Sequence, residues 1–195
     1  MGYKFGCVVM AAGASERFGE NKLLRELEGK PLALRTLEAI PAEAFEKAAV
    51  VTRFAEIADA AQKLGFAVVE NDAPEEGVSR TIRLGIQALS DCDAALFTVA
   101  DQPMLSRGTF LRLLEAWKPG RICAAAENGR RGNPCLFCRS FFPELNALSG
   151  DHGGASVIRR HEDALTLVET PPAELWDCDT PKALEDLKET LKLGE

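Results

Sequence analysis

The chain has 195 residues, of which 46% are hydrophobic and 27% are charged, a balance typical of a folded domain with a buried core. Its formal net charge is −7 and its longest basic runs are arginine pairs, which argues against a nucleic-acid partner. The N-terminus lacks a cleavable signal pattern and no apolar run approaches membrane-spanning length, so we expect a cytoplasmic protein without membrane contact.

Strand-like and helix-like segments alternate along nearly the whole chain, which predicts a mostly parallel sheet with helices on both faces. The expected strands are 5–10, 48–52, 66–69, 94–99, 121–126, 134–137 and 175–178. The expected helices are 30–40, 55–64, 77–89, 106–117, 143–148, 156–161 and 181–191. No repeat, low-complexity stretch or linker interrupts this order. We therefore expect one α/β domain over residues 1–195, a three-layer Rossmann-like sandwich.

Of the six cysteines, Cys7, Cys123, Cys135 and Cys138 lie in apolar, strand-like segments. Cys135 and Cys138 have a spacing found in metal sites, but no second pair lies near them in the sequence. On a strand their side chains would also point to opposite faces. We therefore interpret these cysteines as small hydrophobic residues rather than zinc ligands or redox groups.

The first expected strand leads into the small residues Ala11, Ala12 and Gly13 and then into a polar loop that reaches Lys22. A buried strand followed by small residues lets backbone N–H groups approach a phosphate, because a side chain would hold the backbone away. Arg17 and Lys22 would supply the positive charge that a triphosphate requires. Taken alone, Ala-Ala-Gly fits a plain strand-to-helix turn with solvated charges equally well.

The same loop does not match the two commonest nucleotide-binding patterns. Lys22 follows Gly19 by three residues, which excludes the phosphate-binding loop of the P-loop NTPases. Ser15 stands where the dinucleotide-binding pattern requires its second glycine.

Two aspartate motifs follow later segments. The continuous apolar strand 94–99 is followed by Asp101, at the edge of a parallel sheet where ligands gather. Near the C-terminus, Thr180 and Pro181 make a good helix start on their own, which leaves Asp179 free. Two carboxylates together with phosphate oxygens and waters are a common way to hold Mg²⁺. Each aspartate taken alone is equally consistent with a turn or a surface position.

The string from Ala11 to Lys22 resembles the A-A-G-x-S-x-R-x-G-x-x-K signature of the MobA-like nucleotidyltransferases related to molybdenum cofactor biosynthesis. Asp101-Gln102-Pro103 resembles the D-Q-P metal motif of that family, and 177–181 resembles its D-x-D-T-P motif. The segment 77–82 is similar to the one that lines the nucleotide site, and 131–137 and 150–153 are similar to segments that border the acceptor site. The resemblance covers residues 8 to about 187 and is strongest to the molybdenum cofactor cytidylyltransferases.

This resemblance implies a fold of the GT-A type and the transfer of CMP from CTP to a phosphorylated acceptor, with Mg²⁺ or Mn²⁺ as cofactor. It implies catalytic roles for Lys22, Arg17 and Asp101, and a metal site formed by Asp101 and Asp179. The implied nucleotide contacts are Ala11, Ala12, Gly13, Ser15, Arg17, Lys22, Gly77 and Ser79. The implied acceptor contacts are Asn133, Asp151 and His152.

The acceptor and the base stay open at this point. Many such enzymes have histidine where Asn133 stands and an arginine near Ala155, so the sequence departs from the family on the acceptor side. A molybdopterin cofactor is the expected acceptor and a molybdenum hydroxylase a possible recipient of the product. The alternatives are a guanylyltransferase, a sugar-phosphate or methylerythritol-phosphate nucleotidyltransferase, and a non-catalytic carrier of the molybdenum cofactor.

Overall fold

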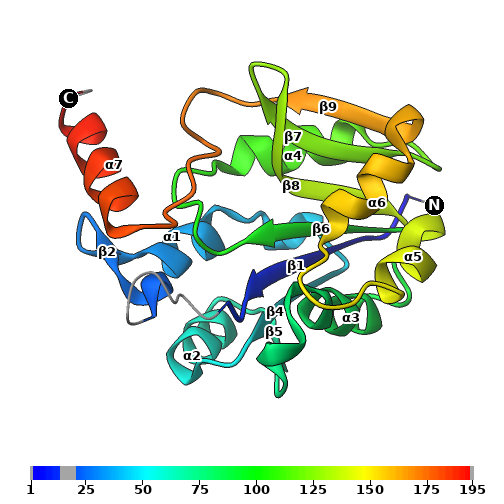
Figure 1. The fold of residues 1–195 in the computed structure, drawn as a ribbon, viewed down its shortest axis with the longest axis horizontal. Coiled ribbons are helices and arrows are strands. Elements are labelled where there is room, and N and C mark those ends of the chain that lie inside the picture. The colour runs from blue at the N-terminus through cyan, green and yellow to red at the C-terminus, as the bar shows by residue number, and fades with distance from the viewer. Residues whose placement is uncertain (1, 14–20, 194–195) are drawn as a thin grey trace.

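The computed structural model describes residues 2–13 and 21–193. Ser15 and Arg17, both predicted to contact the nucleotide, lie outside the described residues. A seven-stranded sheet has the order β5-β4-β1-β6-β8-β7-β9 (Figure 1). Its strands are β1 (Phe5–Ala11), β4 (Lys47–Thr52), β5 (Ala67–Glu70), β6 (Ala94–Val99), β7 (Ile122–Glu127), β8 (Arg130–Cys138) and β9 (Leu165–Glu169).

Strands β5, β4, β1 and β6 run parallel to one another, and β9 runs parallel to β7. Strand β8 is antiparallel to both of its neighbours, β6 and β7. Asn128 and Gly129 join β7 to β8 at φ values of 53° and 72°, the left-handed conformations that a tight hairpin between twisted strands requires. The prediction of a mostly parallel sheet is therefore confirmed, with one antiparallel strand inserted by this hairpin.

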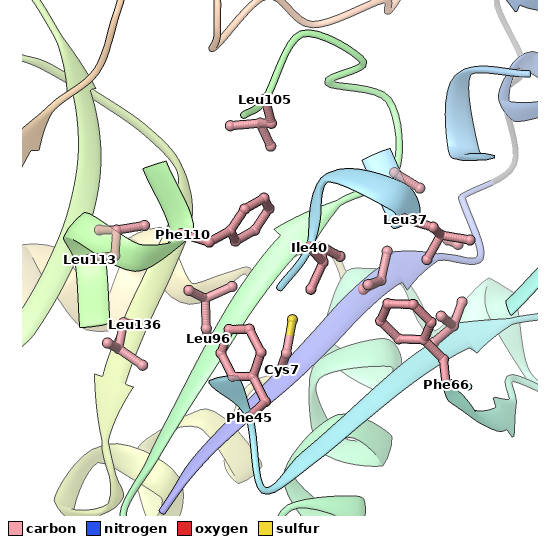
Figure 2. Packing of buried hydrophobic residues seen from close by; sticks show 14 of the residues in the cluster. Cys7, Leu37, Ile40, Phe45, Phe66, Leu96, Leu105, Phe110, Leu113 and Leu136 are labelled. Carbon is pink, nitrogen blue, oxygen red and sulfur yellow. The ribbon is translucent and has the colours of Figure 1, made fainter. Parts of the chain in front are cut away.

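Helices cover both faces of the sheet, as the alternating pattern predicts. One face packs against α1 (Leu32–Ala39), α2 (Ala55–Lys63) and α4 (Arg107–Ala116), and the other against α3 (Val78–Ala88), α5 (Phe142–Asn146) and α6 (Gly154–Arg160). Figure 2 shows the first of these cores, where Leu37 and Phe110 approach Cys7 and Leu96 of the central strands. Within the described residues, no helix is both long and apolar enough to cross a membrane.

The C-terminal helix α7 (Pro181–Leu193) packs away from the sheet, beside the short hairpin of β2 (Glu26–Leu27) and β3 (Lys30–Pro31) (Figure 1). A separate small core joins them, formed by Leu27, Leu32, Cys178, Leu184 and Leu187. This core holds the segment before α7 close to the segment that follows Lys22.

The strand expected at 175–178 is wrong, because Leu175 lies in a turn and 176–179 have no regular structure. The last strand is instead β9, which the sequence analysis missed. Strand β9 is a half-exposed sheet edge that includes Thr166 and Glu169, so it lacks the continuous apolar run of a central strand. Trp176 and Cys178 pack into the small core around α7, and Leu175 packs against the core on the first face of the sheet without joining a strand.

A buried carboxylate anchors the loop between β9 and α7. Glu174 is only 6% exposed, and its Oε2 accepts hydrogen bonds from the Ser106 backbone N–H (3.2 Å) and the buried Thr109 hydroxyl. Ser106 is the N-cap of α4, as the sequence predicts, but its own side chain makes no capping hydrogen bond. Glu174 thus performs the capping from another part of the chain and fixes the loop that leads to Asp177 and Asp179.

We expect Glu174→Ala to lower the free energy of unfolding by about 1–3 kcal/mol, because it leaves the Ser106 N–H and the Thr109 hydroxyl buried without an acceptor. Glu174→Gln should lose less, since its amide oxygen can still accept. Urea denaturation of the variants measures the difference. Glu189→Ala, on the exposed face of α7, is the control and should change stability by less than about 0.5 kcal/mol. An equal loss in both alanine variants would contradict the capping role.

Candidate functional site

A hollow lies where the parallel strands end, and we call it the large cavity. Its volume is about 630 Å³. Residues that directly follow β1, β4, β5 and β6 contribute to its wall, since parallel strands bring their carboxyl ends to one edge. The lining includes Ala12, Gly13, Lys22, Arg53, Asn71, Glu75, Gly77, Thr81, Asp101 and Asp151.

Lys22 lies in the wall of this cavity and connects two carboxylates, of which Asp101 also lines the cavity. Its ammonium Nζ lies 2.5 Å from Asp101 Oδ2 and 2.6 Å from Asp179 Oδ1. Burial by itself would lower the pKa of Lys22, but the charges and hydrogen bonds of the two aspartates outweigh it, so the pKa is raised. Lys22 is therefore a permanent cation. Three of the four residues predicted as the catalytic and metal centre, Lys22, Asp101 and Asp179, lie together, and the fourth, Arg17, lies outside the described residues.

Backbone contacts hold Asp101 in place. The Ala100 N–H donates to the carbonyl of Met10 in β1 (3.3 Å), which aligns the end of β6 with the first loop. The buried hydroxyl of Thr36 lies 3.3 Å from the Ala100 carbonyl and 3.2 Å from the Gln102 carbonyl. Finally, the Cys178 N–H donates to the carbonyl of Asp101 itself (3.0 Å). These bonds fix the backbone on both sides of the carboxylate and join it to the loop before α7.

Asp179 is free to face Lys22 because another residue caps α7. The Thr180 hydroxyl accepts from the Ala183 N–H (3.1 Å), the bond that an N-cap makes three residues into a helix. The side chain of Asp179 is 56% exposed, whereas that of Asp101 is 13% exposed. The pair therefore consists of one carboxylate held by the sheet edge and one at a helix start, rather than two carboxylates at strand ends.

A third carboxylate, Asp177, completes the acidic cluster. Burial raises the pKa of Asp177 to about 6, and the charges of Asp101 and Asp179 act in the same direction. The Gln102 amide donates a 2.9 Å hydrogen bond to Asp177 Oδ1 and partly opposes the rise, as does the charge of Lys22. Three carboxylates against one ammonium leave an excess of negative charge, which favours a further cation.

The donor set fits a divalent cation completed by substrate. Asp101 Oδ1 is buried and has no hydrogen-bond partner among the described residues, so one lone-pair donor remains available. Within 2–13 and 21–193, no group of three histidine, cysteine or acidic side chains is arranged to hold a metal ion alone. Hard cations such as Mg²⁺ are commonly held by one or two carboxylates, with phosphate oxygens and waters as the other ligands.

The opposite wall of the large cavity is the start of α3. Gly77 has φ = 80°, and a Cβ there would lie 2.5 Å from the carbonyl of Gly150 and 2.6 Å from the Asp151 carboxylate. The Ser79 N–H donates to the Gly150 carbonyl (3.1 Å), and this hydrogen bond joins the start of α3 to the loop 150–153. Gly77 therefore allows the loop 150–153 to touch the helix start and brings Asp151 into the cavity wall.

The hydroxyl of Ser79 is not directed to the cavity. Ser79 is fully buried, and its Oγ donates to the Glu76 carbonyl (3.3 Å) and accepts from the Arg83 guanidinium (3.1 Å). Ala11 is also buried outside the lining, and its carbonyl accepts from the Thr52 hydroxyl (3.0 Å). His152 is exposed and lies outside the walls of the large cavity. Nucleotide or acceptor contacts by these three side chains stay predictions without a supporting position.

The sequence analysis missed two polar residues of the lining, Arg53 and Asn71, whereas Thr81 lies in the segment 77–82 that the resemblance places at the nucleotide site. Arg53 follows β4 and lies against the Phe54 ring, with its guanidinium carbon 4.8 Å from the ring centroid. Asn71 follows β5 and donates to the Thr81 hydroxyl (3.1 Å), while its oxygen accepts from the Ala73 N–H. The signal that would have found Arg53 and Asn71 is their position directly after a strand that ends at the same edge as β1 and β6.

Asn133 lies apart from this set. It borders a second, apolar cavity of about 350 Å³ under α3 and α6, which shares Met10, Val78 and Val99 with the large cavity. The predicted nucleotide and acceptor residues thus fall on two adjoining cavities, with Asp151 on the nucleotide side.

Curated relatives cover nearly the whole chain. The purine catabolism protein PucB of Bacillus subtilis is 26% identical over 94% of this chain and 96% of its own length. The nicotine blue oxidoreductase of Paenarthrobacter nicotinovorans is 28% identical over 92% of this chain and 90% of its own. A probable molybdenum cofactor guanylyltransferase of Thermococcus sibiricus is 46% identical, but over only 32% of each chain.

Solved structures show the same fold at low sequence identity. A nucleotidyl transferase from Methanothermobacter aligns over 100% of both chains with a TM-score of 0.85 and 24% identity. A manganese complex of a Mycobacterium tuberculosis protein aligns over 96% of this chain and 99% of its own, with a TM-score of 0.75 and 21% identity. The CMP:2-keto-3-deoxy-manno-octonic acid synthetase, solved with CTP, has a TM-score of 0.73 at 13% identity, over 98% of this chain and 100% of its own.

The Rossmann-like α/β architecture is thus shared with known nucleotidyltransferases. The model of one family, described as the MobA-like NTP transferase domain, matches residues 7–165, which contain β1, the first loop and Asp101. The chain belongs to the MobA-like NTP transferase family.

Proposed function

We propose that this protein transfers CMP from CTP to a phosphorylated acceptor and releases pyrophosphate. The observation that carries the proposal is the contact of Lys22 with Asp101 and Asp179, in which Lys22 and Asp101 line the large cavity. The ammonium of Lys22 can bind phosphate oxygens, and the two carboxylates can bind a divalent cation. Family membership supports the reaction class, but the base and the acceptor are our inference.

The residues of the large cavity would position the donor. Backbone N–H groups near Ala12 and Gly13 would face the triphosphate, with Lys22 and Arg17 neutralising its charge. An acceptor phosphate oxygen attacks the α-phosphorus, a new P–O bond forms, and the bond to pyrophosphate breaks with its electron pair leaving on pyrophosphate. A phosphate nucleophile is already ionised near neutral pH, so the protein needs no general base and acts through position and charge.

Asp101 and Asp179 would hold Mg²⁺ or Mn²⁺, and the buried, unpartnered Oδ1 of Asp101 supports this assignment. The metal, when bound, neutralises phosphate charge and stabilises the leaving pyrophosphate. Lys22, which contacts both carboxylates, would then turn toward the phosphates while keeping its charge.

The residues of the large cavity that would surround the nucleobase support CTP as the donor. Ala12 is only 4% exposed and lines the large cavity, so its methyl group narrows the space next to the loop backbone. Asn71 and Thr81 would offer hydrogen bonds to a base in place of Ser79, since both line the same cavity. GTP is the alternative donor, because relatives of this chain include probable molybdenum cofactor guanylyltransferases.

For the acceptor we propose a molybdopterin cofactor, with a molybdenum hydroxylase receiving the product. A non-catalytic carrier of that cofactor is the alternative, and pyrophosphate separates the two: a carrier binds without releasing it. The decisive experiment measures pyrophosphate release with each of the four NTPs, Mg²⁺ and molybdopterin. Release with CTP alone supports the proposal, and no release with any NTP would contradict it.

Asp101→Asn should lower kcat by at least about 10²–10³, because it removes a metal ligand while keeping the shape of the side chain. If Asp101 and Asp179 act on one metal, the double variant should be little worse than either single variant. Steady-state pyrophosphate release measures both effects. Asp59→Asn, on the exposed face of α2, is the matched control and should retain full activity. Multiplicative losses in the double variant would argue against a shared metal.

Lys22→Ala should lower kcat by about 10²–10³, equivalent to about 3–4 kcal/mol, because a charge-assisted contact to the developing pyrophosphate is lost. Lys63→Ala, which removes an exposed lysine at the end of α2, controls for net charge. Single-turnover rates at saturating CTP separate this loss from weaker binding. A near-normal kcat in the Lys22→Ala variant would contradict the catalytic role of Lys22, which would then be a surface charge only.

CTP should be preferred over GTP by at least about 100-fold in kcat/KM, on the order of 3 kcal/mol. Ala12→Gly should erode this ratio by admitting GTP, because it removes the methyl group that narrows the base site, and should leave CTP use nearly unchanged. Both nucleotides are compared with one acceptor. Equal use of CTP and GTP by the unmodified protein would contradict the cytidylyl assignment and leave nucleotidyl transfer intact.

A further inference from the structure

The apolar cavity adjoins the large cavity on the side of β8, and a further hollow adjoins the apolar cavity. The apolar cavity, of about 350 Å³, is walled mainly by hydrophobic side chains, among them Ile82, Phe97, Phe137 and Leu145. A third hollow, which we call the polar cavity, measures about 580 Å³ and includes Gln102 and Asp177 beside the acidic cluster. The apolar and polar cavities share three residues, Arg131, Gly132 and Asn133. The start of β8 is thus the partition between them.

The pairing of β8 with β7 places most of the β8 side chains that line the apolar cavity. Cys135 pairs with Ala124, Phe137 with Ile122 and Arg131 with Ala126, and these β7 residues share one face because they alternate along the strand. The ladder is irregular between Arg131 and Cys135, where Asn133 lies. Arg131, Asn133, Cys135 and Phe137 all line the apolar cavity, whereas Leu136 belongs to the core on the other face of the sheet. Arg130, which pairs with Glu127, borders the polar cavity without bordering the apolar one.

Arg131 is an available cation in this partition. It is exposed, and it forms no ion pair with a carboxylate among the residues that the structure describes. Its guanidinium lies beside the Cys135 thiol: burial raises the pKa of that thiol to about 11, and the charge and hydrogen bond of Arg131 oppose the rise. A planar guanidinium at the mouth of an otherwise apolar cavity is suited to bind a phosphate group. The cavity itself then remains available for a ring attached to that phosphate.

We propose that Arg131 binds the phosphate of the acceptor, while a flat ring attached to that phosphate enters the apolar cavity. The inference rests on the proposed nucleotidyl transfer and makes it more specific, because it selects ring-bearing phosphates over sugar phosphates. The apolar cavity shares Met10, Val78 and Val99 with the large cavity, so an acceptor held there borders the nucleotide. Its volume lies in the range of small-molecule sites and its lining is that of an apolar ring.

Phenyl phosphate is the probe, because it combines one apolar ring with one phosphate and needs no knowledge of the natural acceptor. Titration calorimetry should show that the unmodified protein binds phenyl phosphate more tightly than inorganic phosphate. Arg131→Ala should weaken phenyl phosphate binding about tenfold or more, the loss expected for one charge-assisted bidentate contact. Titrations with and without α,β-methylene-CTP distinguish this site from Lys22 and Arg53, which also face phosphate in the large cavity.

Two further variants sharpen the test. Arg159→Ala removes an exposed arginine of α6 outside the three cavities, so it has the same change in net charge and should leave binding within twofold. Ala155→Leu adds volume inside the apolar cavity. It should weaken phenyl phosphate and leave inorganic phosphate unchanged. Circular dichroism and the melting temperature verify that each variant is folded.

The inference is overturned if the unmodified protein does not prefer phenyl phosphate to inorganic phosphate, or if Arg131→Ala binds the probe as tightly as the unmodified protein. An equal loss in Arg131→Ala and Arg159→Ala would also overturn it, because the effect would then be one of net charge. The proposed function is tested separately by pyrophosphate release. If phenyl phosphate binding depends on Arg131 but no NTP is turned over, the anion site is supported and nucleotidyl transfer is contradicted. If an NTP is turned over but phenyl phosphate binding does not depend on Arg131, nucleotidyl transfer is supported and the anion site is contradicted.

Discussion

The ion contacts of Lys22 join three parts of the chain that are far apart in sequence. Its ammonium lies within 2.6 Å of carboxylates from Asp101 and Asp179. Without that cation, these two carboxylates and Asp177 would repel one another at the edge of the sheet. Burial is the main cause of the raised pKa of Asp177, and the charges of Asp101 and Asp179 add to it. The Lys22 ammonium neutralises part of the negative charge of the three carboxylates. The negative charge that remains favours the binding of a divalent cation, as a polyphosphate site requires.

The fold places this cluster through backbone hydrogen bonds more than through side-chain packing. The Cys178 N–H bonds the Asp101 carbonyl, and the Thr36 hydroxyl lies against the carbonyls on either side of Asp101. Glu174 ties the same loop to the start of α4. Because each of these bonds acts on the backbone, Asp101 is held in place while its Oδ1 stays without a partner and is available for a ligand.

The three cavities around the cluster divide the site by chemistry. The large cavity presents small residues, a lysine and an arginine, which suits a nucleotide and its phosphates. The apolar cavity presents aromatic and aliphatic side chains, with Arg131 at its border with the polar cavity. The antiparallel strand β8, introduced by the Asn128-Gly129 turn, forms that border. A hairpin in an otherwise parallel region thus creates a second binding region beside the strand ends.

The sequence by itself determined the alternating α/β order, the central strands and the candidates Lys22, Asp101 and Asp179, because continuous apolar runs and the residues that end them are local features. Only the tertiary structure decided that 175–178 is a loop and that β9 is the last strand, since the loop is held by distant partners such as Asp101 and Ser106. It likewise decided that Ser79 faces inward, while Arg53, Asn71 and Thr81 line the cavity. The contacts that hold the loop before α7 join residues tens of positions apart, and no local periodicity encodes them.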